Sequence, residues 1–191
     1  MIGISKLYCG AVEPSDALRY GRESGQLPSH LLQFSKDKKP VVVWNMTQRC
    51  NLKCVHCYAQ AIDPKGTDPI STEQAKAIID DLAAFGAPVM LFSGGEPLVR
   101  EDLVELASYA TGKGMRAVIS TNGTLITKRK AKELKDVGLS YVGISLDGAE
   151  EVHDHFRGVT GSYKKALEGV ANCQAEGLKV ATRSSTGVNY I

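Results

Sequence analysis

Three cysteines stand close together in the string RCNLKCVHCY, with three residues between Cys50 and Cys54 and two between Cys54 and Cys57. Thiolates bind zinc and also hold iron–sulfur clusters. In a reducing compartment, a tight group of thiols favours a metal or cluster site over disulfides. Three thiolates on a four-iron cluster leave one iron open to an outside ligand, whereas a structural zinc takes four ligands. The spacing therefore favours a four-iron cluster.

Two other interpretations of these cysteines stay open at this point. A zinc site would need a fourth ligand from His56, Cys9 or Cys173, and the cysteines could instead be ordinary structural residues. Cys173 follows Val170 by three positions on a predicted helix, so we expect it to pack as a small hydrophobic residue. Cys9 lies in an apolar stretch, and we expect a structural role for it too.

The elements that would position the cysteines begin at Pro40, where short β-branched runs start to alternate with amphipathic stretches. Such alternation predicts an α/β fold with a parallel sheet and right-handed crossovers. Ser71 and Gln74 have the spacing of a capping box, and Gly86 follows the end of the same predicted helix. The predicted strands cover residues 41–45, 88–92, 115–120, 141–146 and 179–182, and the predicted helices residues 71–85, 101–113, 128–137 and 163–176.

Polar loops follow the first four predicted strands. Ligands of parallel α/β proteins bind beyond the carboxyl ends of the strands, so these loops predict where the functional site lies. The first loop, residues 47–58, carries the three cysteines and is called the cysteine loop below. The other loops are rich in glycine, hydroxyl, amide and carboxylate groups, and begin SGGEP at residue 93, TNG at residue 121 and DG at residue 147.

The order of these motifs resembles the radical S-adenosylmethionine (SAM) superfamily, since the cysteine loop is followed by FSGGEP, STNG and ISLDG after successive strands. The resemblance covers about residues 40–182 and implies a partial (β/α)6 radical SAM barrel, incomplete at the C-terminus. It implies that Cys50, Cys54 and Cys57 hold a [4Fe–4S] cluster whose open iron is chelated by the amino and carboxylate groups of SAM. His56 stands where the family usually has an aromatic residue near the adenine, and its planar ring can stack.

The resemblance also implies SAM-binding residues in the later loops. Gly94 and Gly95 lack a β-carbon, so their backbone can approach a ligand closely, and Pro97 fixes the turn. Glu96 could accept hydrogen bonds from the amino group of SAM, or could be a first-turn helix acid favoured by the helix dipole. For the polar residues near Asn-Gly and Asp-Gly, turn chemistry is the alternative to ligand binding. The side chains suited to the ribose and carboxylate of SAM are Ser120, Asn122, Ser145 and Asp147.

The chemistry that the resemblance implies is reductive cleavage of SAM. A reduced cluster passes one electron to the sulfonium, the carbon–sulfur bond breaks, and methionine and a 5'-deoxyadenosyl radical form. The radical then abstracts a hydrogen atom from the substrate. The protein must keep the cluster potential low and exclude water and oxygen, while a reductase or a ferredoxin- or flavodoxin-type partner donates the electron.

Residues 1–39 are expected to form an N-terminal extension, and residues 40–191 the radical SAM core domain. The strings MIGISKLYCG, EPSDALRYGR and LPSHLLQF resemble the extension of radical SAM enzymes of tetrapyrrole biosynthesis. Within that group the resemblance is greatest to the didecarboxysiroheme deacetylases of the alternative heme pathway, which remove two acetate side chains to give iron-coproporphyrin. A heme d1 biosynthesis enzyme and a peptide-modifying radical SAM enzyme are the alternatives.

Several basic side chains could recognise a tetrapyrrole. Its carboxylates could pair with arginines and its iron could be approached by histidines, although both residue types are also common as solvated or structural residues. The arginines are Arg19, Arg22 and Arg157, and the histidines are His30, His153 and His155.

The composition limits the remaining possibilities. The 191 residues carry 23 basic and 21 acidic side chains, and this balance argues against a nucleic-acid partner. No apolar run approaches the roughly 20 residues that span a bilayer, and the first ten residues lack the order of a signal peptide, so we expect a cytoplasmic protein without a membrane partner. We also expect C-terminal truncation, because the tetrapyrrole enzymes that the chain resembles continue into a cysteine-rich region with an auxiliary cluster, which Cys9 and Cys173 alone cannot build. A fragment and an altered reading frame are the alternatives.

Overall fold

A parallel five-stranded sheet forms the centre of the fold in the computed structural model, which describes residues 39–183 except residues 58, 62 and 64. The strands lie in the order β1-β2-β3-β4-β5, and each neighbouring pair is parallel. This arrangement confirms the α/β fold. The strands are β1 (Val42–Thr47), β2 (Val89–Gly94), β3 (Arg116–Thr121), β4 (Tyr141–Ser145) and β5 (Val180–Arg183).

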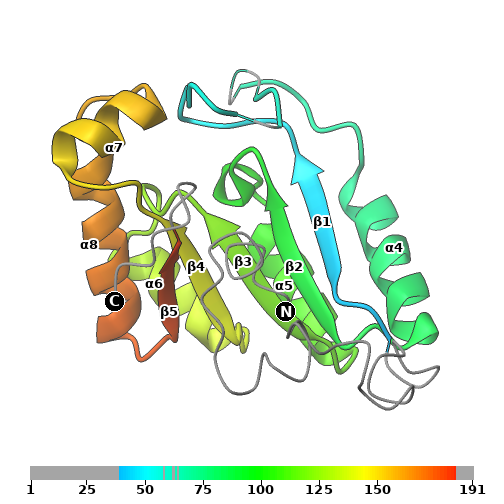
Figure 1. The fold of residues 1–191 in the computed structure, drawn as a ribbon. Coiled ribbons are helices and arrows are strands. Elements are labelled where there is room, and N and C mark those ends of the chain that lie inside the picture. Colours follow the sequence, from blue (N-terminus) through cyan, green and yellow to red (C-terminus); the bar gives the residue numbers. More distant parts are fainter. Residues whose placement is uncertain (1–38, 58, 62, 64, 184–191) are drawn as a thin grey trace, which may run out of the picture. The chain divides into compact units, whose positions relative to one another are not determined.

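Helices line the sheet and contact one another in the order α4, α5, α6 and α8 (Figure 1). Helix α7 lies on the chain between β4 and α8 and packs against α8. None of the helices among the described residues is long and apolar enough to cross a membrane. The helices are α4 (Thr72–Phe85), α5 (Leu103–Gly112), α6 (Lys128–Asp136), α7 (Glu150–Arg157) and α8 (Ser162–Ala175), with one 3-10 turn, η2 (Pro97–Val99).

The ends of α4 follow the sequence prediction. Ser71 and Gln74 form the capping box, with each side chain accepting a hydrogen bond from the backbone N–H of the other residue. Gly86 ends the helix in the left-handed conformation, at φ +85°. Ala75 and Ile79 are fully buried, so the predicted apolar face of the helix packs against the rest of the domain.

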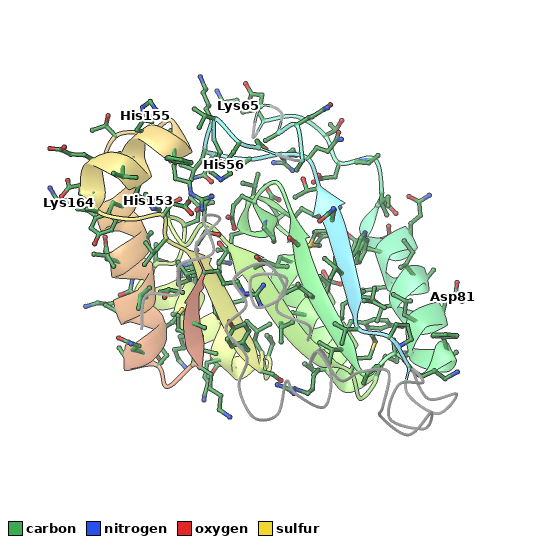
Figure 2. All side chains as sticks on the ribbon, in the orientation of Figure 1. His56, Lys65, Asp81, His153, His155 and Lys164 are labelled. Atoms are coloured by element: carbon green, nitrogen blue, oxygen red, sulfur yellow. The ribbon has the colours of Figure 1, made fainter. Side chains whose placement is uncertain are left out.

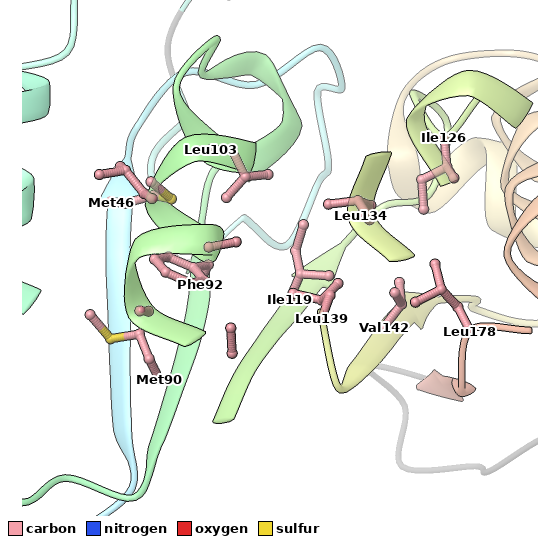
Figure 3. Close-up of a cluster of buried hydrophobic side chains, with 14 of the residues drawn as sticks. Met46, Met90, Phe92, Leu103, Ile119, Ile126, Leu134, Leu139, Val142 and Leu178 are labelled. Carbon is pink, nitrogen blue, oxygen red and sulfur yellow. The ribbon is translucent and has the colours of Figure 1, made fainter. Parts of the chain in front are cut away.

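The hydrophobic core lies between the sheet and the helices (Figure 3). Alternate residues of the central strands, such as Phe92, Ile119 and Val142, are fully buried against it. Cys173 is also fully buried in this core, which confirms the prediction that it packs as a small hydrophobic residue. Burial raises the pKa of its thiol to about 11.

The structure departs from the predicted elements at several bounds, and most clearly at β1, β2 and α7. Strands β1 and β2 each run two residues further than predicted, to Thr47 and Gly94, because the strand pairing continues through polar residues. Helix α7 has no counterpart in the prediction, since its buried residues are His153 and Arg157 and no apolar stripe marks it. The boundary after residue 39 stays a prediction, because residues 1–38 lie outside the described residues.

Candidate functional site

A cavity of about 110 Å³ lies at the carboxyl ends of the strands, where the polar loops predicted a site. It brings together the cysteine loop and the ends of β2, β3 and β4. Its lining includes most of the predicted site residues, but Glu96, Pro97 and Asp147 are buried outside it. The lining residues are Cys50, Leu52, Cys54, His56, Cys57, Ala59, Ala61, Ser93, Gly94, Gly95, Ser120, Thr121, Asn122, Ser145 and Arg157.

All three clustered cysteines have free thiols and line this cavity. Cys50 is the most buried of them at 8% exposure, and its sulfur accepts a hydrogen bond from the N–H of Leu52 at 3.4 Å. Burial raises the pKa of the Cys50 thiol to about 11. Among the described residues, no three metal-binding side chains converge closely enough to hold a single metal ion. The three thiols are thus arranged around a shared space rather than one point.

The histidines divide between the cavity and the α7 segment. His56 lies on the cysteine loop beside the end of α7, where its ring centroid is 5.2 Å from that of Phe156 (Figure 2). His153 is 1% exposed, and its Nδ1 accepts a hydrogen bond from the N–H of Asp147. Burial, with the nearby Arg157 charge, lowers the pKa of His153, and the hydrogen bond from Asp147 gives the buried ring a structural role. His155 is exposed on α7, and His30 lies outside the described residues.

The glycines at the end of β2 bring that strand against the cysteine loop. A β-carbon on Gly94 would lie 2.3 Å from the carbonyl oxygen of Thr47, and one on Gly95 2.3 Å from that of Arg49. Gly94 also has φ +128°, which side-chain-bearing residues rarely adopt. The N–H of Gly95 donates to the Thr47 carbonyl at 2.8 Å. The glycines therefore let two rim segments meet backbone to backbone, in addition to leaving their own backbone open to the cavity.

Replacing Gly95 with alanine is expected to lower the free energy of unfolding by about 2 kcal/mol, because the new methyl group overlaps a backbone oxygen that cannot move freely. Gly112, at the end of α5, is a matched control, since a β-carbon there meets nothing within 4 Å. Gly112→Ala should raise the free energy of unfolding by about 0.5 kcal/mol through helix propensity. Urea unfolding of both variants measures the difference in their free energies of unfolding. Equal values would show that the close approach of Gly95 to the Arg49 carbonyl does not exclude a β-carbon.

Glu96 is fully buried directly behind the cavity lining. Its Oε1 accepts hydrogen bonds from the Thr121 hydroxyl at 2.7 Å and the Leu98 N–H at 3.1 Å, and its Oε2 accepts one from the Asn122 N–H at 2.8 Å. Burial raises the pKa of the carboxyl group, while these hydrogen bonds act in the opposite direction. Glu96 caps η2, in which Pro97 is the first residue. The carboxylate thus ties the end of β2 to the loop after β3.

Side-chain amides and hydroxyls connect the remaining loops. Asn122 donates to the side-chain oxygen of Asn51 at 2.9 Å, and Asn51 donates to the hydroxyl of Thr124 at 2.8 Å. Ser120 and Ser145 line the cavity from the ends of β3 and β4. The rim therefore presents hydroxyl groups and backbone to the cavity, and its Asn122 amide also fastens the cysteine loop to the loop after β3.

Arg157 is the site residue whose position sequence reasoning missed. It was considered for pairing with substrate carboxylates or as a solvated surface residue, but it is buried, lines the cavity and forms an ion pair with Asp147. The predicted ligand Asp147 is itself 1% exposed. The sequence signal that could have located Arg157 is its place at the end of a short helix that starts at the rim loop after β4. Arg19, Arg22 and Cys9 lie outside the described residues.

Known proteins share sequence with this chain, and a family model matches most of it. A family model described as "Radical SAM superfamily" matches residues 44–190. The "Fe-coproporphyrin III synthase" of Methanosarcina barkeri is 72% identical over 183 residues, which are 96% of this chain and 46% of that protein. The "Pre-heme d1 synthase" of Dinoroseobacter shibae is 45% identical over 145 residues, which are 76% of this chain and 36% of that protein. The chain thus spans less than half the length of these curated relatives.

A solved structure described as "Native anSMEcpe with bound AdoMet" has the same fold, with a TM-score of 0.62. It is 23% identical in sequence, and the match covers 73% of this chain and 42% of that one.

Proposed function

Because the chain belongs to the radical SAM superfamily, we propose that it is the cofactor-binding part of an enzyme that starts radical chemistry on a tetrapyrrole. Enzymes of this superfamily use SAM and a [4Fe–4S] cluster. The observation that carries the proposal is that three free thiols and the ends of three strands line one cavity. The three thiols alone, or the strand ends alone, would be compatible with other functions.

The residues around the cavity fit both cofactors. Cys50, Cys54 and Cys57 would hold three irons of the cluster, which leaves one iron open to SAM. Cys173 cannot complete a four-ligand zinc site here, because it is buried in the hydrophobic core. The SAM-binding residues that we propose are His56, Gly94, Gly95, Ser120, Asn122 and Ser145 in the cavity lining. The predicted residues Glu96, Pro97 and Asp147 are buried behind that lining and would support it rather than contact SAM.

When bound, the cluster and SAM would supply the chemistry, a one-electron reductive cleavage of the SAM carbon–sulfur bond. The protein's own contribution is to bind, orient and shield. Backbone carbonyls of Gly94 and Gly95 suit a cationic amino group, and the hydroxyls of Ser120 and Ser145 can donate to a carboxylate or bind a ribose. Glu96 keeps the loops around that space in register through its three hydrogen bonds.

For the substrate, we propose didecarboxysiroheme, from which two acetate side chains are removed to give iron-coproporphyrin. Each removal would take one hydrogen atom from the ring carbon next to the one that bears the acetate side chain, and a double bond would form between these two carbons as the side chain is released. The released group would take up one electron and one proton to leave as acetate, and a reductase or a ferredoxin- or flavodoxin-type donor would supply the electrons. The name of the 72% identical relative, "Fe-coproporphyrin III synthase", supports iron-coproporphyrin as the product. Heme d1 precursor formation is the second candidate, supported by the 45% identical relative.

The substrate proposal is tested with anaerobically reconstituted protein, SAM, a reductant and didecarboxysiroheme. We expect 5'-deoxyadenosine, acetate and iron-coproporphyrin, identified by mass spectrometry. A different tetrapyrrole product, formed without release of acetate, would favour the heme d1 alternative. Modification of a peptide with no turnover of any tetrapyrrole would overturn the substrate class.

A further inference from the structure

The last residues of α7 hold the part of the cysteine loop that contains Cys54. The N–H of Lys53 donates to the carbonyl of Arg157 at 3.1 Å, and the N–H of Val55 donates to the carbonyl of Phe156 at 3.0 Å. The two hydrogen bonds flank Cys54 in the sequence. A β-carbon on Gly158 would lie 2.3 Å from the Lys53 carbonyl oxygen, so a glycine is needed for this close approach. The backbone around Cys54 is therefore fixed by α7.

The side chain of Arg157 reaches the sulfur of the same cysteine. Its Nη1 lies 3.7 Å from Cys54 Sγ in a hydrogen bond, and its Nη2 forms an ion pair with Asp147. The exposed fractions of the two paired side chains are 10% for Arg157 and 0% for Asp147. A guanidinium group keeps its charge at every physiological pH and presents several donors in a fixed plane. One end of this group is thus anchored by Asp147 while another donates toward the thiol.

A donor at a cluster-ligating sulfur affects the electron affinity of the cluster. Hydrogen bonds to the sulfurs and nearby charge are among the factors that set the reduction potentials of iron–sulfur clusters. Reduction adds one electron and forms or breaks no bond, so the reduced state carries more negative charge. A buried cationic donor stabilises that extra charge more than it stabilises the oxidised state. Arg157 is placed to favour reduction.

We infer that Arg157 is a positioning residue that raises the midpoint potential of the cluster held by Cys50, Cys54 and Cys57, with Asp147 fixing the guanidinium in place. The inference rests on the proposed function, because it requires the cluster. Arg157 would make the cluster easier for the electron donor to reduce, and this reduction comes before substrate binding.

The test is a redox titration of the reconstituted protein without SAM or substrate, so that neither ligand contributes. Arg157→Gln removes the charge and keeps a polar side chain. We expect the ratio of reduced to oxidised cluster to fall about tenfold at a fixed solution potential, which for a one-electron couple is a shift of about 59 mV to more negative values. Arg157→Lys should give an intermediate potential, because an ammonium group cannot reach both Asp147 and Cys54 as a planar fork does.

Arg129→Gln is the matched control, since it removes the same charge from an arginine side chain that is 83% exposed on α6. This variant should keep the parent potential. A loaded Arg157→Gln protein with the parent potential overturns the inference, and so does an equal shift in Arg129→Gln. If Arg157→Gln does not retain the cluster, Arg157→Lys decides, and a parent potential in that variant overturns the inference. Failure of the proposed function would be seen separately, as a parent protein without iron and sulfide.

Discussion

Replacing Cys54 with alanine is expected to lower the iron bound after anaerobic reconstitution from about four atoms per chain to less than about one. Each of the three cysteines would hold one iron, and removal of one thiolate leaves two irons without a protein ligand. The effect should be nearly complete, because the other thiol of the described core, Cys173, is buried among apolar residues and cannot replace it. Iron and acid-labile sulfide analysis of the purified variant provides the measurement.

Cys173→Ala is the control for this experiment, because it also removes one thiol. It should keep about four irons and lose about 1 kcal/mol of unfolding free energy from the small cavity that it creates in the core. A Cys54→Ala protein that still bound four irons would show that Cys54 is not a cluster ligand.

Replacing Glu96 with alanine is expected to lower the free energy of unfolding by about 3 kcal/mol, the largest loss of stability that we predict for a single rim residue. The carboxylate is fully buried and accepts hydrogen bonds from Thr121, Asn122 and Leu98. Alanine would leave two backbone N–H groups and a hydroxyl without this acceptor. Glu96→Gln should lose less, because one oxygen remains to accept.

Urea unfolding of the cluster-free protein measures this effect without any contribution from SAM. Glu105→Ala on α5 is the matched control, since Glu105 is 56% exposed and pairs with Lys76 at the surface. Its loss should be below about 1 kcal/mol, as for other exposed ion pairs. If Glu96→Ala were as stable as Glu105→Ala, the hydrogen bonds of Glu96 would not hold the loops together.

The sequence contained enough information to locate the site but not to assign every residue in it. Strand and helix patterns predicted the α/β fold, and the position of polar loops after strands predicted that Cys50, Gly94 and Ser120 would share one rim. These inferences succeed because the carboxyl ends of parallel strands meet at one edge of a sheet. The residue pattern within each segment was sufficient to predict the fold and the shared rim.

Contacts between distant segments could not be predicted in the same way. A glutamate such as Glu96 could bind an amino group. Only the fold shows that its carboxylate oxygens already accept hydrogen bonds from Thr121 and Asn122. The pairing of Asp147 with Arg157 depends on α7, which turns the chain back toward the cysteine loop. No helix was predicted there, because the residues that α7 buries are the polar His153 and Arg157.

The central claim is that Cys50, Cys54 and Cys57 hold a [4Fe–4S] cluster with one iron open to SAM. The most direct test is low-temperature electron paramagnetic resonance of the anaerobically reconstituted, reduced protein, recorded before and after SAM is added. The account predicts the signal of a reduced four-iron cluster, and a change in its shape when SAM binds the open iron. Bound zinc with no cluster signal, or a cluster signal that SAM leaves unchanged, would contradict it.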